Sequence, residues 1–250
     1  MDASIPAGPW LEHLVSHLPM AKAGDNPQAV HQVRIALERL RVWLFLGQRH
    51  EQELELKWLR DEVGRVRDLQ IQLQEEPPDA LAELLRAQLA AAQARLAETL
   101  EQPRVQWLVD SLRALPALEG GAIKGRLRRL LREVKQRGRR AAGQHNLKRW
   151  HKLRQALRRL RFALEWQGQR PKKLIALQDV LGAMNDHANT LRYLAQVAPS
   201  PELEERRERV ERDLSRLRRK AERRWRRIRP RLRRKKLLAA RRSPDAPAPG

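Results

Sequence analysis

Apolar side chains recur along this chain three or four residues apart, the spacing that places them on one face of an α-helix. Glycine and proline are clustered between these periodic segments. No segment shows the alternation of β-branched residues that predicts a strand, so we expect no strands. The pattern therefore predicts an all-α fold. The expected helices span roughly residues 9–20, 27–46, 51–74, 79–100, 103–115, 122–142, 146–167, 172–197 and 201–228.

The chain contains an internal repeat. HQVRIALERLR at residues 31–41 resembles HKLRQALRRLR at residues 151–161, at an offset of 120 residues. LRDEVGRVRDLQIQL at residues 59–73 resembles LQDVLGAMNDHANTL at residues 177–191, at an offset of 118. The two-residue difference falls in the connection between two helices, where length varies most freely. We therefore expect two similar helical bundles in tandem.

The repeat and the glycine and proline clusters predict how the chain is divided. PALEGG at residues 116–121 is the best linker candidate. We expect residues 1–118 to form a first four-helix bundle and residues 119–228 a second one, related to it by pseudo-two-fold symmetry. Residues 229–250 are basic and rich in proline and alanine, and we expect them to be a disordered tail.

Charge is distributed unevenly over the chain, which carries a formal net charge of +23. The first 120 residues hold 13 basic and 18 acidic side chains, whereas the rest hold 40 and 12. Such an excess indicates an anionic partner. The absence of cysteine excludes disulfides, thiolate zinc sites and a cysteine nucleophile. No apolar run is long enough for a membrane span, and the N-terminus lacks a signal-peptide pattern, so we expect a cytoplasmic protein without membrane contact.

A helical wheel, with about 100° per residue, separates each copy of the repeat into an apolar face and a basic flank. The apolar face holds Val33, Leu37, Leu40 and Leu44 in the first copy, and Leu153, Leu157, Leu160 and Leu164 in the second. The basic flank beside it holds His31, Arg34 and Arg41 in the first copy, and His151, Arg154, Arg158 and Arg161 in the second. Arg39 and Arg159 fall on the other side of the wheel.

Guanidinium groups hold phosphate oxygens through paired N–H donors. If the two copies face each other, their basic flanks form a groove or pore suited to phosphates. The alternative is that each arginine pairs with a carboxylate of its own bundle, such as Glu38, Asp61 or Asp68. Additional candidates for the binding surface are His13 on the first helix and, on the helix before the second copy, Arg128, Arg132, Lys135 and Arg139.

The repeated segments resemble the CHAD family, the conserved histidine α-helical domains. The resemblance rests on HQVRIALERLR and HKLRQALRRLRFALEW, each followed by a helix that carries GRVRD or GAMND, and it covers roughly residues 9–228. It implies two four-helix bundles around a central basic pore that binds inorganic polyphosphate, and an association with polyphosphate granules. The implied binding residues are His31, Arg34, Arg41, His151, Arg154 and Arg161, with Arg39 and Arg159 as further candidates.

CHAD domains often accompany a CYTH triphosphate-tunnel domain, which begins with the motif ExExK. Residues 53–57, with the sequence ELELK, match this motif formally. The tunnel requires a strand, in which alternate residues share one face. The segment is expected to be helical here, and two residues that are two positions apart then diverge by about 200°. We therefore interpret the match as coincidental.

These observations predict a protein without catalytic activity that binds inorganic polyphosphate in a basic pore or groove between two helical bundles, and that is thereby targeted to polyphosphate granules or regulates them. The acidic residues Asp61, Asp68, Asp179 and Asp186 recur at a spacing of seven. We expect them to cap helices or form ion pairs, so no metal site and no cofactor is predicted. Two alternatives stay open. One is a protein that binds nucleic acid through its basic segments, although an aromatic content of 4% offers few stacking platforms. The other is an accessory subunit of a polyphosphate-metabolising enzyme.

Overall fold

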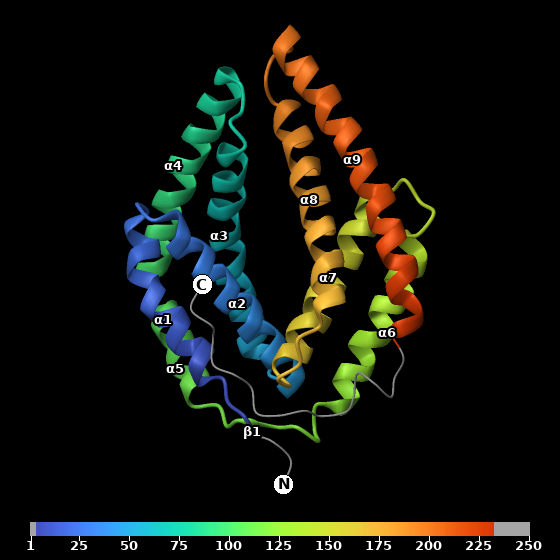
Figure 1. Cartoon of the computed structure of the whole chain (residues 1–250). Coiled ribbons are helices and arrows are strands. Elements are labelled where there is room, and N and C mark those ends of the chain that lie inside the picture. The colour runs from blue at the N-terminus through green and yellow to red at the C-terminus, as the bar shows by residue number, and fades with distance from the viewer. Residues whose placement is uncertain (1–3, 233–250) are drawn as a thin grey trace. The chain divides into compact units, whose positions relative to one another are not determined.

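The computed structural model describes residues 4–232 and shows an all-α protein (Figure 1). Nine α-helices lie within these residues, and their ends fall within about four residues of the predicted ones, which confirms the prediction of an all-α fold. None of these helices is long and apolar enough to cross a membrane. The helices are α1 (Gly8–Ala23), α2 (Pro27–Gly47), α3 (His50–Gln74), α4 (Asp79–Glu101), α5 (Pro103–Arg113), α6 (Lys124–Ala141), α7 (Leu147–Glu165), α8 (Lys172–Leu194) and α9 (Pro201–Ile228).

The expectation of no strands is wrong at two short segments. Strand β1 (Ser4–Ile5) pairs antiparallel with β2 (Leu118–Glu119), and β2 lies inside the predicted linker. A two-residue strand has no periodicity that a sequence pattern can reveal. Ile5 and Leu118 are both buried, and the Nε1–H of Trp43 donates to the carbonyl of Ile5 at 2.9 Å. The pair therefore attaches both ends of the first set of helices to the core around Trp43.

The chain divides into two compact units, and the boundary along the sequence falls between Ile123 and Lys124. The first unit contains α1 to α3, most of α4, and α5. Within it, α1 packs on α2, α2 packs on α3, and α5 contacts α1 and α3. The second unit contains α6 to α9, in which each helix packs on the next. Its last helix is followed by one 3-10 turn, η1 (Arg229–Arg231), at the start of the expected tail, while residues 233–250 lie outside the described residues.

The two helices that carry the basic flanks begin in the same way. The side chain of Asn26 accepts hydrogen bonds from the backbone N–H groups of Gln28 and Ala29 at the start of α2, at 2.9 and 3.3 Å. Asn146 accepts from the N–H of Lys148 at 3.0 Å at the start of α7. An asparagine in this position satisfies N–H groups that have no partner within the helix. Because Asn26 and Asn146 are also 120 residues apart, the repeat includes the helix cap.

The apolar faces of α2 and α7 form the centres of the two cores. Side chains on these faces are at most 1% exposed, which confirms the core face that the helical wheel predicts. Complete burial of a leucine contributes roughly 2 kcal/mol to folding, so these faces fix the rotation of each helix about its axis. The basic flanks are thereby held at the edge of each core. The buried residues are Val33, Leu37, Leu40, Leu44, Leu153, Leu157, Leu160 and Leu164.

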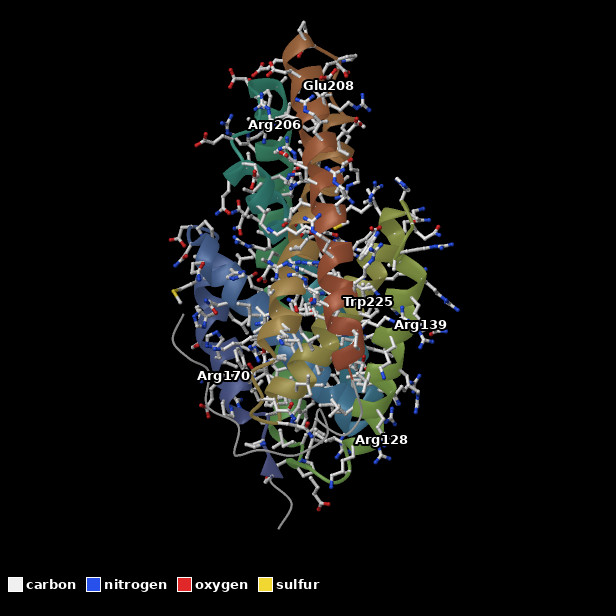
Figure 2. The ribbon with its side chains drawn as sticks, turned by 45° about the vertical axis from the view of Figure 1, so that its right-hand side comes forward. Arg128, Arg139, Arg170, Arg206, Glu208 and Trp225 are labelled. Atoms are coloured by element: carbon white, nitrogen blue, oxygen red, sulfur yellow. The ribbon has the colours of Figure 1, made fainter. Side chains whose placement is uncertain are left out.

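Helix α9 approaches α6 closely at a glycine. A Cβ atom added to Gly138 would overlap the ring of Trp225, which is 1% exposed (Figure 2). The indole therefore occupies the space that a side chain on α6 would need. This contact closes the second unit between its first and last helices.

Candidate anion-binding site

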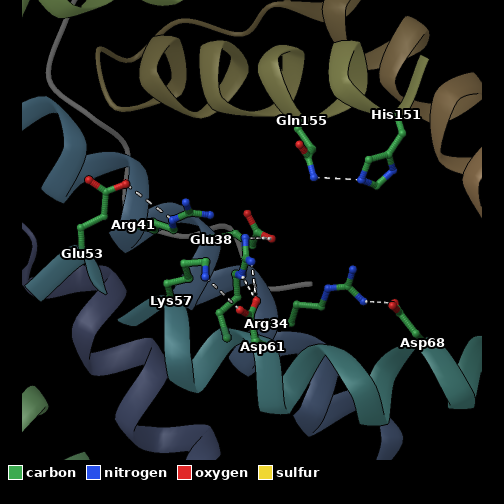
Figure 3. Close-up of polar contacts among 10 residues, drawn as sticks. Arg34, Glu38, Arg41, Glu53, Lys57, Asp61, Asp68, His151 and Gln155 are labelled. Atoms are coloured by element: carbon green, nitrogen blue, oxygen red, sulfur yellow. Dashed lines mark hydrogen bonds and ion pairs between the residues drawn. The ribbon is translucent and has the colours of Figure 1, made fainter. Parts of the chain in front are cut away.

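The histidine flank of α2, which consists of His31, Arg34 and Arg41, faces helix α3. Nη1 of Arg34 donates to Oδ1 of Asp68 at 2.8 Å, and Nε of Arg41 lies 3.6 Å from Oε1 of Glu53 (Figure 3). The arginine side chains are 20% and 24% exposed. The alternative that an arginine pairs with a carboxylate of its own bundle therefore holds for Arg34. Its partner, Asp68, is one of the carboxylates named from the sequence. Each arginine is held in place by α3 and remains partly accessible to a ligand.

His31 lies half-buried among positive charges. Burial lowers the pKa of His31, and the charges of Arg67 and Arg34 lower it further. Without a bound anion, the imidazole of His31 is therefore mostly neutral at pH 7. An anion that bound between these groups would counter both charges and favour the protonated form of His31.

A second group of charges follows on α3, next to the histidine flank of α2. Arg60 donates from Nε to Asp61 at 3.1 Å, and its Nη1 lies 3.9 Å from the buried carboxylate of Glu38 on α2. Nζ of Lys57 lies 3.6 Å from Asp61. Asp61 and Glu38 thus both contact cations of α3. Asp61 takes part in ion pairing, as expected from the sequence.

The histidine flank of α7, which consists of His151, Arg154, Arg158 and Arg161, faces α8 in the second unit. Nδ1 of His151 donates to Oδ1 of Asn185 on α8 at 2.7 Å. Nε2 of His151 accepts from Nε2 of Gln155 at 2.8 Å (Figure 3). These two amides hold the ring at the contact between α7 and α8. The ring also lines a pocket of 210 Å³ between α7 and α8, whose floor includes Trp150 and Met184.

The arginines of this flank are half-buried beside α7's core face. Nε of Arg161 donates to Oε1 of Glu165 at 2.6 Å, and its guanidinium lies 5.4 Å from the centre of the Phe162 ring. Arg154 and Arg158 stand between Arg161 and His151 along the helix. Each unit therefore holds one histidine and a row of arginines on the side of its central helix that faces the next helix.

The residues opposite the two histidines occupy equivalent positions in the repeat, and the sequence reasoning missed them. Arg67, whose charge acts on His31, and Asn185, which accepts from His151, are 118 residues apart, the offset of the second repeat segment. Each directly precedes one of the repeated aspartates, Asp68 and Asp186. The offset itself was the signal that could have identified them. A comparison limited to identical residues does not find this position, because it is arginine in the first copy and asparagine in the second.

Arg39 and Arg159 lie on the other side of their helices, toward α1 and α6. The guanidinium of Arg39 stacks 4.3 Å from the ring centre of Trp10 on α1. Nη2 of Arg159 donates to Oε1 of Glu133 on α6 at 2.5 Å, and Glu133 also accepts from Nε of Arg137 at 2.7 Å. The structure therefore does not bring these two arginines together with the histidine flanks.

His13 belongs to the cluster around Trp10 and Arg39. Its Nε2 lies 3.1 Å from Oε1 of Gln32, and its ring centre lies 5.3 Å from that of Trp10. Burial lowers the pKa of His13, the hydrogen bond that His13 donates to Gln32 opposes this shift, and the charges of His17 and Arg39 add to it. The structure thus places His13 on the α1 side of α2, whereas the histidine flank of α2 faces α3.

The cationic row on α6 makes no ion pair within residues 4–232. Arg128 and Arg139 extend from the outer side of α6 in Figure 2. They lie on a different face of the helix from Glu133, which pairs with Arg159. The row consists of Arg128, Arg132, Lys135 and Arg139, of which only Lys135 is half-buried and the others are exposed. These side chains form an unneutralised anion-attracting surface beside the second unit's core.

The match to the CYTH motif is coincidental, as the sequence indicated. Residues 53–57 lie inside α3, and each charged side chain has a partner of its own. Glu53 pairs with Arg41, and Lys57 pairs with Asp61. Glu55 receives two hydrogen bonds from Arg104, at 2.6 and 3.0 Å, and these bonds lower the pKa of Glu55.

An all-α fold with a tandem repeat, and with a histidine and arginines on the same flank of each copy, defines the class of this protein. The chain belongs to the CHAD domain family, whose model matches residues 8–196. The match ends before α9, so it is shorter than the resemblance expected over residues 9–228.

Two solved structures share the fold. The chain is similar to a CHAD domain from the plant Ricinus communis, with 23% identity and a TM-score of 0.63 over 98% of this chain and 96% of that one. It is also similar to PptA from Streptomyces chartreusis, with 16% identity and a TM-score of 0.63 over 89% of this chain and 100% of that one. No curated protein matches the chain.

Proposed function

We propose that this protein binds inorganic polyphosphate through the histidine flanks of α2 and α7. The observation that carries the proposal is that both central helices present a histidine and arginines on the side that faces the following helix, α3 or α8. Membership of the CHAD family supports the choice of ligand, because the resemblance implies polyphosphate binding. The proposed residues of the flanks are His31, Arg34, Arg41, His151, Arg154, Arg158 and Arg161.

The chemistry of the flanks suits a chain of linked phosphates. Arginine donates two parallel N–H groups to phosphate oxygens, and a polyanion gains affinity when its condensed counterions are released. The carboxylates Asp68 and Glu53 compete for the same guanidinium groups. Partly exposed ion pairs contribute at most about 1 kcal/mol, whereas a hydrogen bond to a charged group contributes about 1.5–3 kcal/mol. A phosphate chain that contacts several arginines can therefore replace these carboxylates.

We propose a binding role without catalysis. On α3, Asp61 pairs with Lys57 and Arg60, and Asp68 pairs with Arg34. These two carboxylates orient the basic side chains that they contact. In the cell, such a protein would hold polyphosphate at cytoplasmic granules, where enzymes that make or degrade the polymer act on it.

Isothermal titration with inorganic polyphosphates of graded length, at two salt concentrations, tests this function. The flank variant Arg34→Gln/Arg154→Gln should bind about tenfold more weakly, because each unit loses one charge-assisted contact. The matched control is Arg113→Gln/Arg216→Gln, which also removes one arginine from each unit. These arginines pair with Asp110 and Asp213 on α5 and α9, outside the flanks.

Competition decides between polyphosphate and nucleic acid as the ligand. Single-stranded DNA of matched charge should displace polyphosphate poorly, because the flanks offer guanidinium groups but few rings for base stacking. Affinity should fall steeply with salt. Equal binding by the flank and control variants, or efficient displacement of polyphosphate by DNA, would contradict the proposal.

A further inference from the structure

Helix α9 changes its charge pattern halfway along its length. In its first half, arginines pair with carboxylates three or four residues away on the same helix. Arg209 pairs with Glu205 at 2.8 Å, Arg212 with Glu208 at 3.3 Å, and Arg207 with Glu204 at 3.5 Å. Figure 2 marks this half by Arg206 and Glu208, and the second half by Trp225. The first half is thus a solvated surface whose cations are largely neutralised.

The second half of α9 lacks this neutralisation. From residue 217 to residue 228 it holds seven basic side chains and one acidic side chain, Glu222. Four of the basic residues recur at the spacing of one helical face, next to the face that buries Trp225. None of the four forms an ion pair within the described part of the chain. They are Lys220, Arg223, Arg224 and Arg227.

These cations line a pocket between α9 and the beginning of α8. The pocket has a volume of 800 Å³, and Lys173 and Ala176 from the first turns of α8 complete its wall. Ile228 and Pro230 supply an apolar edge. Among the residues described, no carboxylate and no aromatic ring lines it. The N-terminal end of α8 adds the positive end of a helix dipole to the same space.

Compensation of the helix dipole does not account for the whole cluster. Basic side chains near the C-terminus of a helix are favoured by the dipole within the last turn only. Arg226 and Arg227 lie in the last turn of α9. Lys220 and Arg223 lie further back along the helix, and Lys173 comes from α8, where the dipole disfavours a cation. Cations from two helices repel one another when they are gathered in one place without carboxylates. Such a cluster therefore indicates an anionic ligand.

We propose that this pocket is a second binding site, for a short run of directly linked phosphates. The cations converge within one concave volume, so a ligand with several charges on neighbouring groups fits better than one with widely spaced charges. Without an aromatic ring in the lining, the pocket offers no stacking platform for a nucleic acid base. Apart from Lys173 and Ala176, the lining residues lie outside the matched residues 8–196, and the site does not depend on binding by the histidine flanks.

Titration of the full-length chain with inorganic tripolyphosphate tests the pocket. The pocket variant Arg223→Gln/Arg224→Gln/Arg227→Gln should lose one binding event, with affinity at that site reduced by about tenfold or more. The control Arg207→Gln/Arg209→Gln/Arg212→Gln removes the same charge from the paired half of the same helix and should keep the event. The flank variant Arg34→Gln/Arg154→Gln should keep it too, so a failure of the pocket is distinguished from a failure of the flanks.

Lysine acylation followed by mass spectrometry gives a readout on the unaltered protein. Tripolyphosphate should protect Lys173 and Lys220 from an amine-reactive reagent, while Lys124, exposed on α6, should react as before. Unchanged reactivity of Lys173 and Lys220 at saturating tripolyphosphate would overturn the proposal. So would protection of both lysines by single-stranded DNA at lower concentration than by tripolyphosphate, because the pocket would then be a nucleic acid site.

Discussion

The carboxylate of Asp68 offers a sharp test of the histidine flank on α2. It accepts from Arg34 at 2.8 Å and leaves that arginine 20% exposed, while Asp68 itself is 38% exposed. If polyphosphate binds Arg34, it must take the guanidinium from this carboxylate. The change Asp68→Asn removes the competing charge and keeps a similar shape. We therefore expect Asp68→Asn to bind polyphosphate more tightly than the unaltered protein.

The size of the gain follows from the exposure of the pair. An ion pair this accessible to water contributes about 0.2–1 kcal/mol, with the upper value suited to a short and partly buried contact. Because about 1.4 kcal/mol corresponds to a tenfold change, the dissociation constant should fall by at most about fivefold. The free energy of unfolding should fall by no more than about 1 kcal/mol for the same reason.

Titration of a short polyphosphate into Asp68→Asn and a matched control measures this effect. The control is Asp110→Asn, which alters net charge equally and frees Arg113 on α5, where the pair is 3.0 Å long and both side chains are 56% exposed. A difference between the two variants isolates the local competition from the general change in charge. If Asp68→Asn binds more weakly than the unaltered protein, Asp68 positions Arg34 for the ligand instead of competing with it, and the reasoning is refuted.

Two further predictions concern packing and pH. Gly138→Ala should lower the free energy of unfolding by about 1–3 kcal/mol in urea denaturation, because the new methyl group meets the Trp225 ring. Gly182→Ala, with open space around its Cβ, should instead be neutral or stabilising. The pKa of free His31 lies below its usual 6.5 and bound polyphosphate should raise it, so affinity should be highest below the free pKa and fall as pH rises through the interval between the two values. Titration across this range should show a flatter profile for His31→Gln; an unchanged profile would exclude a role for this imidazole.

Much of the fold was predictable because its determinants are local in the sequence. Helix limits follow from apolar periodicity and from proline and glycine between the helices, and α3 ends at Gln74 as predicted. The pair of β1 and β2 was not predictable in this way. It depends on Ser4 and Ile5 meeting residues far along the chain, and on a hydrogen bond from Trp43 to Ile5. Two-residue strands carry no periodic signal of their own.

The candidate site was predictable in its residues but not in their partners. The helical wheel gives the direction in which Arg34 and Arg39 point relative to the core of their own helix. It does not say which residue of a neighbouring helix meets them, because that depends on the crossing angle and the register of the packed pair. Arg34 meets Asp68 on α3, and Arg39 meets Trp10 on α1. The family resemblance listed both as binding candidates, whereas the wheel and the packing place them on different sides of α2.

The two units use the same framework with different charges, which assigns them different contributions to anion binding. In the first unit, Arg67 stands opposite His31 and carboxylates occupy Arg34 and Arg41, so an incoming phosphate must displace internal partners. In the second unit, neutral amides hold His151, and neither the cationic row on α6 nor the pocket cations on α9 form ion pairs among the described residues. Since long-range attraction grows with unneutralised charge, the second unit should supply most of the attraction. The first unit, with its histidine between two arginines, should supply the sensitivity to pH.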